Sequence, residues 1–517
     1  MRTTVAPLVL AVTLPLSAQS PASAPAPAAA PVTFTEHVAP ILFAHCASCH
    51  RPGEAAPFPL LSYDDARRKA RMIQRVTRSR FMPPWHAEPG HVPFADERRL
   101  TAAQIATLGA WADGGAPEGD PRKLPPLPEF PQGWQLGTPD LVVTMKAPFA
   151  VPASGGDIYR NFVLPLGLTE DRWVVAVELR PTARSVVHHS LFFLDETGSA
   201  RAQDGRDGRP GFRGMNFGAQ ALLGGGGGAR RGGSLGGWAV GGTPRRLPMD
   251  LALPLPKGAD LVLQTHFHPS GKVEQEQTTV GLYFAPKPPA RTLVPIQVPP
   301  LFGATWGIDI PAGESRYVVK DSFTLPVVVD AVMVGGHAHY LCTTMRCTAK
   351  APDGSEQVLL SVPRWDFNWQ DHYAFRAPVR LAKGTVLTME LTYDNSADNP
   401  ANPNAPPRRV RWGRESNDEM GSITLQVVPA DEAQLPELQR AVRAAVTNRV
   451  PRNMSRLALG MVDRILEWDR NGDGKIEESE VPERFRPFLD QVDRNGDRVI
   501  TKDEIEALRQ ELRGGRR

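Results

Sequence analysis

The sequence lacks several features that mark large classes of protein. Its 4 cysteines among 517 residues exclude a small scaffold held together by many disulfides. Its formal net charge of +3 is too small to indicate a nucleic-acid partner. It also has no uninterrupted apolar run of about 18 residues, which is the length that a membrane-spanning helix needs. We therefore expect no nucleic-acid partner and no membrane span.

Aromatic residues are also scarce, at 7%, whereas the chain has 51 prolines and 46 glycines. This composition favours many turns and β-strands over helical bundles. With 517 residues, of which 41% are hydrophobic, the chain is long enough for three or four separately packed domains.

The N-terminal residues have the pattern of a secretory signal peptide. Arg2 precedes an apolar segment, Val5–Leu16, and small residues follow as far as Ala24. We therefore expect residues 1–24 to be a signal peptide and the mature protein to be periplasmic or secreted. The alanine- and proline-rich tract that follows is expected to be a disordered tether.

The strongest local motif after this segment is C-x-x-C-H, formed by Cys46, Cys49 and His50. Two thiols one helical turn apart can each bond a vinyl group of haem c, and the next imidazole can ligate the iron. A redox dithiol or a zinc pair is the alternative, but no second cysteine pair lies nearby. The motif predicts a small α-helical cytochrome c domain over residues 25–120.

A haem iron in this domain needs a sixth ligand from further along the chain. Met82 is the best candidate, because the two prolines that follow it keep that loop extended and stiff. Met72 is the alternative, but it lies in a helical pattern, Tyr63–Arg78. The segments Pro40–Leu42 and Met82–Trp85 resemble the small cytochrome c domains that are fused to bacterial oxidoreductases.

After a proline-rich linker at residues 121–139, the pattern changes to short alternating strands separated by proline and glycine. No long helix is indicated before about Asp431. Such spacing indicates antiparallel β-sandwiches or jelly rolls, and we predict one over residues 140–288 and another over residues 289–430. The predicted strands include Trp173–Leu179, Val186–Leu194, Leu261–Phe267, Thr278–Ala285, Arg316–Phe323, Val327–Val334, Thr343–Lys350, Gln357–Val362, Val386–Tyr393 and Ser422–Val428.

Histidines at the ends of these strands have the spacing of metal ligands. His337 and His339 follow the strand Val327–Val334, and a strand sends alternate side chains to the same face. Two imidazoles on one rigid face make half of a metal site. His188 and His189 are adjacent, so a regular strand would turn them to opposite faces. Joint ligation would require a twist or bulge at that point.

Four short motifs appear in a fixed order between residues 140 and 430. They resemble the signatures of the type II copper, ascorbate-dependent monooxygenases, the family of peptidylglycine α-hydroxylating and dopamine β-monooxygenases. The motifs are Val187-His188-His189, Leu263-Gln264-Thr265-His266, His337-Ala338-His339 and Asp418-Glu419-Met420.

The resemblance implies two single copper centres on two β-sandwich domains that face a solvent cleft. An electron-transfer copper would be held by His188, His189 and His266. A second copper, where oxygen binds and a C–H bond of the substrate is hydroxylated, would be held by His337, His339 and Met420. His268 ranks below His266 as an outer or alternative ligand, because the Leu-Gln-x-His match falls on His266.

The residue types suit this assignment better than its rivals. Imidazoles bind both oxidation states of copper, and a thioether favours Cu(I). A non-haem iron site would need a carboxylate ligand, which neither histidine cluster has at close spacing. A blue-copper site at Cys342 and Met345 would leave the other motifs unexplained. Cys342 and Cys347 would face opposite ways in a straight strand but can pair across a bulge, so a disulfide between them stays open.

Three features depart from the family pattern. The glycine-rich segment 205–242 is interpreted as an insertion, either a disordered loop or a lid. The aromatic run 364–370 is interpreted as a cluster at the end of a sandwich, with pocket lining as the alternative. No residue matches a recognition group for a peptide carboxylate or a catecholamine, so the resemblance does not identify the substrate.

The C-terminal region, residues 431–517, is expected to contain a helix at Glu432–Val446 and then a pair of EF-hands. The first calcium loop has its turn glycine, Gly474, whereas the second has Arg498 at the equivalent position, which predicts weaker binding. The predicted calcium ligands are Asp469, Asn471, Asp473, Lys475, Glu477 and Glu480 in the first loop, and Asp493, Asn495, Asp497, Val499, Thr501 and Glu504 in the second.

Together these patterns predict an exported oxidoreductase with haem c, two coppers and calcium. It would use O2, an external electron donor and a small-molecule or peptide substrate. The haem would relay electrons to copper, with flow from copper to haem, or fusion of two independent redox modules, as the alternatives. The alternative is a non-catalytic copper and haem protein that transfers electrons or binds a partner.

Overall fold

The computed structural model describes residues 31–52, 54, 56–130, 133–213, 233–239, 242–248, 250–304, 306–413 and 415–447. In the C-terminal region it describes residues 468–469, 473–477, 479–481 and 499–506. The predicted signal peptide lies outside the described residues, as does the central part of the glycine-rich segment.

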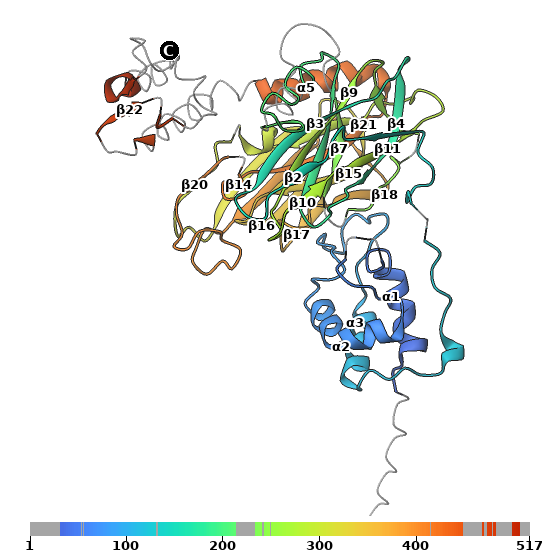
Figure 1. Ribbon diagram of the computed structural model, residues 1–517. Helices are drawn as coiled ribbons and strands as arrows, with labels where there is room; N and C mark the ends of the chain where they lie inside the picture. Colours follow the sequence, from blue (N-terminus) through green and yellow to red (C-terminus); the bar gives the residue numbers. More distant parts are fainter. Residues whose placement is uncertain are drawn as a thin grey trace, which may run out of the picture.

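The first domain is helical and packs around its own apolar core (Figure 1). Its elements are η1 (Phe34–Val38), α1 (Ala39–His45), α2 (Tyr63–Arg78) and α3 (Ala102–Asp113). Side chains cap the two longer helices: Ser62 accepts a hydrogen bond from the Asp65 N–H, and Thr101 forms a capping box with Gln104. The helix predicted at Tyr63–Arg78 is confirmed with the same bounds.

The second domain is a β-sandwich whose two main sheets share one core. One sheet has the order β1-β11-β4-β8 and the other β6-β3-β9-β5-β7, while β2 and β10 form a separate pair. The strands are β1 (Leu141–Thr144), β2 (Phe149–Val151), β3 (Ile158–Pro165), β4 (Arg172–Arg180), β5 (Val187–Asp195), β6 (Phe212–Arg213), β7 (Ser234–Ala239), β8 (Leu253–Leu255), β9 (Asp260–Phe267), β10 (Glu274–Glu276) and β11 (Thr279–Phe284).

The third domain repeats this architecture. Its four-stranded sheets have the orders β12-β21-β15-β18 and β14-β19-β16-β17, and β13 pairs with β20. The strands are β12 (Val294–Val298), β13 (Asp309–Ile310), β14 (Tyr317–Thr324), β15 (Val329–Ala338), β16 (Cys342–Lys350), β17 (Glu356–Val362), β18 (His372–Leu381), β19 (Val386–Tyr393), β20 (Val410–Arg411) and β21 (Gly421–Pro429). Strand pairing is antiparallel in all these sheets, as expected for sandwiches.

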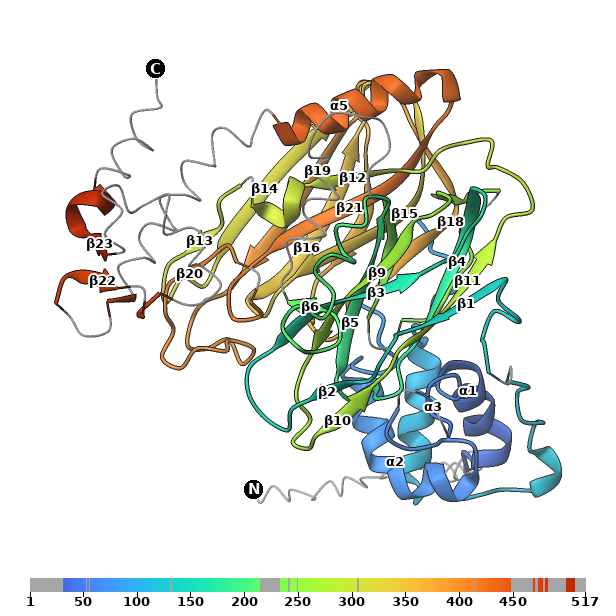
Figure 2. The same ribbon diagram turned by 45° about the horizontal axis from the view of Figure 1, so that its top comes forward.

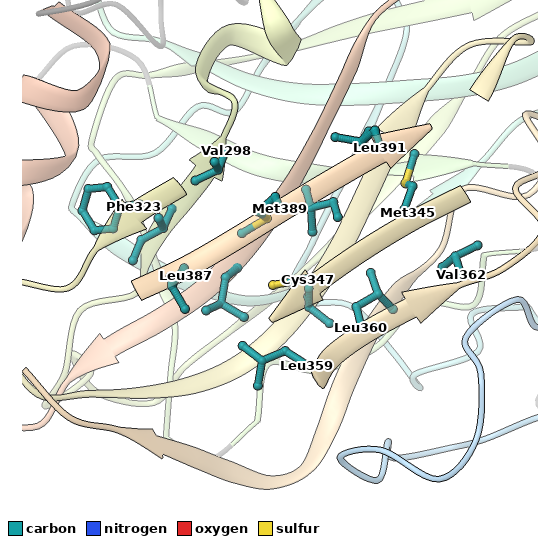
Figure 3. Packing of buried hydrophobic residues seen from close by; sticks show 14 of the residues in the cluster. Val298, Phe323, Met345, Cys347, Leu359, Leu360, Val362, Leu387, Met389 and Leu391 are labelled. Atoms are coloured by element: carbon teal, nitrogen blue, oxygen red, sulfur yellow. The ribbon is translucent and has the colours of Figure 1, made fainter. Parts of the chain in front are cut away.

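The core of the third domain includes two of the four cysteines. Cys342 and Cys347 are both buried, and both are free thiols. Figure 3 shows Cys347 among Met389, Leu360 and other apolar side chains. Strand β16 has an irregular register with β19 between Cys342 and Thr344. A bulge of this kind was the condition for pairing Cys342 with Cys347, but no disulfide forms.

The three domains contact one another. Trp85, Ala87 and Phe94, which follow the second helix of the first domain, are buried in the core of the third domain. Leu251 from the second domain packs against Val332 and Val428 of the third. The predicted linker also contacts the second domain: the backbone N–H of Gln135 donates to the carboxylate of Glu178 on β4 at 2.9 Å.

A helix, α5 (Leu435–Thr447), follows the third domain after the short turn η4 (Glu432–Gln434), close to the predicted bounds. Figure 2 shows α5 alongside the sheet that contains β12 and β21. Further on, β22 (Lys475–Glu477) pairs with β23 (Val499–Thr501). In the described residues, no helix has the length and apolar character needed to cross a membrane.

Candidate metal centre

The first histidine cluster is built on the neighbouring strands β5 and β9. His189 lies directly across from His266 in the antiparallel pairing of these strands. The register shifts between Val187 and His189, so His188 occupies a β-bulge. The bulge lets two adjacent histidines contribute to one cluster, as the sequence argument required.

The imidazoles of this cluster converge through their Nδ1 atoms. The Nδ1 atom of His189 lies 3.1 Å from that of His188 and 3.4 Å from that of His266. Nitrogen ligands about 2.0 Å from a shared metal ion would lie about 3.3 Å apart. One ligand atom from each residue falls within 4.8 Å of the others, so the three side chains fit a single metal ion.

Burial favours the neutral imidazoles that bind metals. Burial and the neighbouring His266 lower the pKa of His188 to about 3. The same two causes hold the pKa of His189 well below its usual range. At neutral pH both rings therefore keep a lone pair for an ion.

The carboxylate of Asp157 lies behind the His266 ring. Its Oδ2 atom lies 3.2 Å from His266 Nε2, and its Oδ1 atom lies 2.9 Å from His268 Nδ1. Ser416, in the third domain, donates a hydrogen bond to the same carboxylate. Burial alone would raise the pKa of Asp157, but these contacts hold it well below its usual range. His268 itself is largely exposed and lies outside the converging group.

The second cluster lies at the end of β15 and presents the other ring nitrogen. His337 Nδ1 lies 2.7 Å from Gln370 Oε1, and His339 Nδ1 lies 3.2 Å from the Asp418 carbonyl oxygen. Both partners are acceptors, so each Nδ1 carries the proton and each Nε2 keeps its lone pair. Burial lowers the pKa of His337 to about 4 and that of His339 to about 3. The two ring centroids are 5.4 Å apart.

The predicted third member of this cluster, Met420, lies next to it in the fold. Ala338 on β15 pairs with Gly421 on β21, so one step further places Met420 across from His339. Met420 is buried, and its carbonyl oxygen accepts a hydrogen bond of 3.1 Å from the Tyr393 hydroxyl. Met420 is thus a buried residue at the strand position next to that of His339.

Glu419 is a structural residue of this cluster that the sequence argument quoted only as part of a motif. It is fully buried, and its carboxylate accepts hydrogen bonds from the N–H groups of His339, Leu341 and Met420. Burial raises its pKa to about 8, although these backbone hydrogen bonds oppose the rise. The carboxyl group joins the strand that carries the histidines to the turn that carries Met420.

The ring of Phe367 lies between the two clusters. It stacks on His188 with a centroid distance of 4.7 Å and meets His339 edge-on at 5.8 Å. Phe367 is buried, so a packed side chain contacts both clusters at the place where the resemblance implied a solvent cleft. The aromatic run that contains it was interpreted as a cluster at a sandwich end, and local sequence gave no sign that it reaches both histidine clusters.

The C-x-x-C-H motif of the first domain forms a turn directly after α1. Cys46 and Cys49 are free, and the His50 N–H donates to the Cys46 carbonyl at 2.8 Å. His50 Nδ1 lies 3.0 Å from the Phe58 carbonyl oxygen, so the proton sits on Nδ1 and Nε2 is left for an iron ion. Met82 is half-buried and Met72 is exposed on α2.

Parts of the two predicted calcium loops lie within the described residues. The loops meet through β22 and β23, with Ile476 opposite Ile500. Asp469 accepts a hydrogen bond of 2.9 Å from the Gly474 N–H, and both Glu480 and Glu504 are buried. The predicted ligands Asn471, Asp493, Asn495 and Asp497 lie outside the described residues.

Comparison with known proteins does not assign a family. No protein-family model matches the chain, and no curated protein matches it. Among solved structures, the major capsid protein P2 from Bacteriophage PM2 is 7% identical, with 56% of this chain and 96% of that chain covered and a TM-score of 0.24. The infectious bursal disease virus VP2 subviral particle is 9% identical, with 57% and 73% covered and a TM-score of 0.17. Scores this low carry no information about function.

Proposed function

We propose that the chain is an exported copper monooxygenase that hydroxylates a C–H bond of its substrate with O2. The observation that carries the proposal is the convergence of three imidazoles, those of His188, His189 and His266, on one point. The order of the motifs and the pairing of two imidazoles with a thioether favour copper over zinc or iron.

The two clusters would have different roles. His188, His189 and His266 would hold an electron-transfer ion through Nδ1, and Asp157 would keep the His266 ring in place. At the second cluster, His337 and His339 would bind through Nε2, with Met420 as the third ligand. Copper in these two sites would supply two electrons, one from each ion, which is the number that hydroxylation with O2 consumes.

The first domain would hold haem c and relay electrons. Cys46 and Cys49 would attach the haem, His50 would ligate its iron through Nε2, and Met82 would be the sixth ligand. A thioether ligand raises the haem potential, which suits a relay between an external donor and copper. The C-terminal loops would bind calcium in a structural role.

The alternative function, a non-catalytic copper and haem electron-transfer protein, is favoured by one observation. The buried ring of Phe367 contacts His188 in the first cluster and His339 in the second, and such packing between two metal centres suits electron transfer between them. O2 consumption coupled to a hydroxylated product distinguishes the two functions.

Copper stoichiometry in single variants tests the metal assignment. We expect two coppers per chain in the wild type and one in His189→Ala. The reason is that Nδ1 of His189 lies within 3.4 Å of Nδ1 of both His188 and His266. His268→Ala is the matched control and should keep both coppers, because that ring lies outside the convergence. Wild-type protein that prefers zinc, or equal copper in all three proteins, would contradict the proposal.

A further inference from the structure

The loop Arg364–Asp371, here called the aromatic loop, contacts both histidine clusters. Gln370 Oε1 accepts a hydrogen bond of 2.7 Å from His337 Nδ1. Phe367 lies between His188 and His339. The indole N–H of Trp365 donates to the His339 carbonyl oxygen at 3.2 Å. A movement of this one loop would therefore disturb both clusters.

A segment of the first domain, Pro84–Arg98, here called the strap, packs beside the aromatic loop. Trp85 meets Tyr373 edge-on at a centroid distance of 5.0 Å, and Phe94 stacks on Phe375 at 5.5 Å. Phe94 and Phe375 also form a backbone bridge, and all four rings are buried. The strap thus extends the sheet at β18, which begins immediately after the loop.

The strap holds the aromatic loop at both ends. At one end, His86 Nδ1 lies 3.2 Å from the carbonyl oxygen of Arg364. At the other end, Arg98 forms an ion pair with Asp371, and both side chains are largely buried, with exposed fractions of 20% and 18%. Arg98 also donates to the Pro84 carbonyl at 3.1 Å, which ties the two ends of the strap together.

We propose that the strap controls the geometry of the histidine clusters through the aromatic loop, with Gln370 and Phe367 as positioning residues. Gln370 fixes the tautomer and ring angle of His337, and the Arg98–Asp371 ion pair fixes the backbone next to Gln370. The strap begins two residues after Met82, so docking of the first domain and the arrangement of the second cluster are mechanically linked. The inference rests on the proposed function only for the identity of the ion.

Two variants and a control test this link. Asp371→Asn should increase hydrogen–deuterium exchange in residues 364–371, with or without copper, and should change the electron paramagnetic resonance signal of copper at the second cluster. Gln370→Ala should weaken copper binding there by about 10-fold or more, the usual effect of losing a ligand's hydrogen-bond partner. Gln370→Glu keeps an acceptor oxygen and should restore the binding. Asp113→Asn removes an exposed ion pair with Arg71 and should change none of these readings.

The outcomes separate this inference from the proposed function. Exchange in the aromatic loop that is the same in Asp371→Asn and wild-type protein would overturn the link. The link would also be overturned if Gln370→Ala protein bound copper at the second cluster with wild-type affinity and an unchanged signal. Wild-type protein that binds no copper, but whose loop still loosens in Asp371→Asn, would overturn the metal assignment and support the strap's hold on the loop.

Discussion

At the scale of single residues, the two histidine clusters offer different ring nitrogens. In the first cluster the Nδ1 atoms converge, whereas in the second Gln370 and the Asp418 carbonyl engage Nδ1 and leave Nε2 for an ion. The two centres should therefore have distinct spectra. The ligands of each centre come from a separate sandwich. Removal of one ligand should therefore affect only the centre to which it belongs.

The first prediction follows from this separation. His337→Ala or Met420→Ala should disturb the copper at the second cluster and leave the signal of the first unchanged. Copper quantification together with electron paramagnetic resonance checks it. If either substitution emptied both sites, the assignment of independent ligand sets would be wrong.

The second prediction concerns the calcium loops. Glu480→Gln should weaken calcium binding more than Glu504→Gln, because only the first loop has glycine at its sharp turn, where Gly474 has a φ of +80°. Arg498, at the equivalent position of the second loop, lies outside the described residues. Calorimetry of both variants checks the order of affinities, and a tighter second loop would contradict it.

At the scale of elements, apolar alternation predicted ten of the strands in the two sandwiches, namely β4, β5, β9, β11, β14, β15, β16, β17, β19 and β21. β4, β5, β9, β11 and β19 lie within one or two residues of their predicted bounds. β3 was not among the named strands, because Arg160 and Asn161 are polar residues at buried positions and interrupt the alternation. The bulge at His188 was predictable, since adjacent ligands cannot otherwise share one face.

The buried guanidinium of Arg160 gives a third prediction, on stability. Arg160 forms a bidentate ion pair with Asp207 at 2.8 and 2.7 Å, and this contact lowers the pKa of Asp207 to about 2. Asp207→Asn should cost about 1–2 kcal/mol in the free energy of unfolding, after allowance for solvent screening of the partly exposed carboxylate. Chemical denaturation measures this loss.

The pH dependence of the same pair has a definite sign. The folded pKa of Asp207, about 2, is below its ordinary value of 3.8, so its contribution to stability is complete above that value. The contribution is lost as the pH falls towards 2. The difference in stability between wild type and Asp207→Asn should therefore shrink over this range, and a difference that stays constant would contradict the assignment.

At the scale of the whole molecule, contacts between domains determine features that local sequence does not encode. Phe367 reaches both clusters only because two separate sandwiches bring His188 and His339 to the same place. The strap lies in the sequence of the first domain but packs in the core of the third. Periodicity and motif spacing describe neighbours along the chain, so neither contact was predictable from them.

The fourth prediction is electron transfer within the chain. When pre-reduced, copper-loaded protein is mixed rapidly with O2, the haem should oxidise in step with the copper centres. Copper-free protein, with the same haem content, is the control and should oxidise more slowly. Haem that stays reduced while copper turns over would remove the support for a relay, as would Met82→Ala protein that transfers electrons at the full rate.

The metal positions provide the most direct test of the central claim. Crystals of copper-loaded protein, measured on both sides of the copper absorption edge, should give two anomalous peaks per chain. One peak should lie among the Nδ1 atoms of His188, His189 and His266, and the other beside Nε2 of His337 and His339, within reach of Met420. The absence of a copper peak at the first cluster, or a peak there that scatters as zinc, would contradict the account.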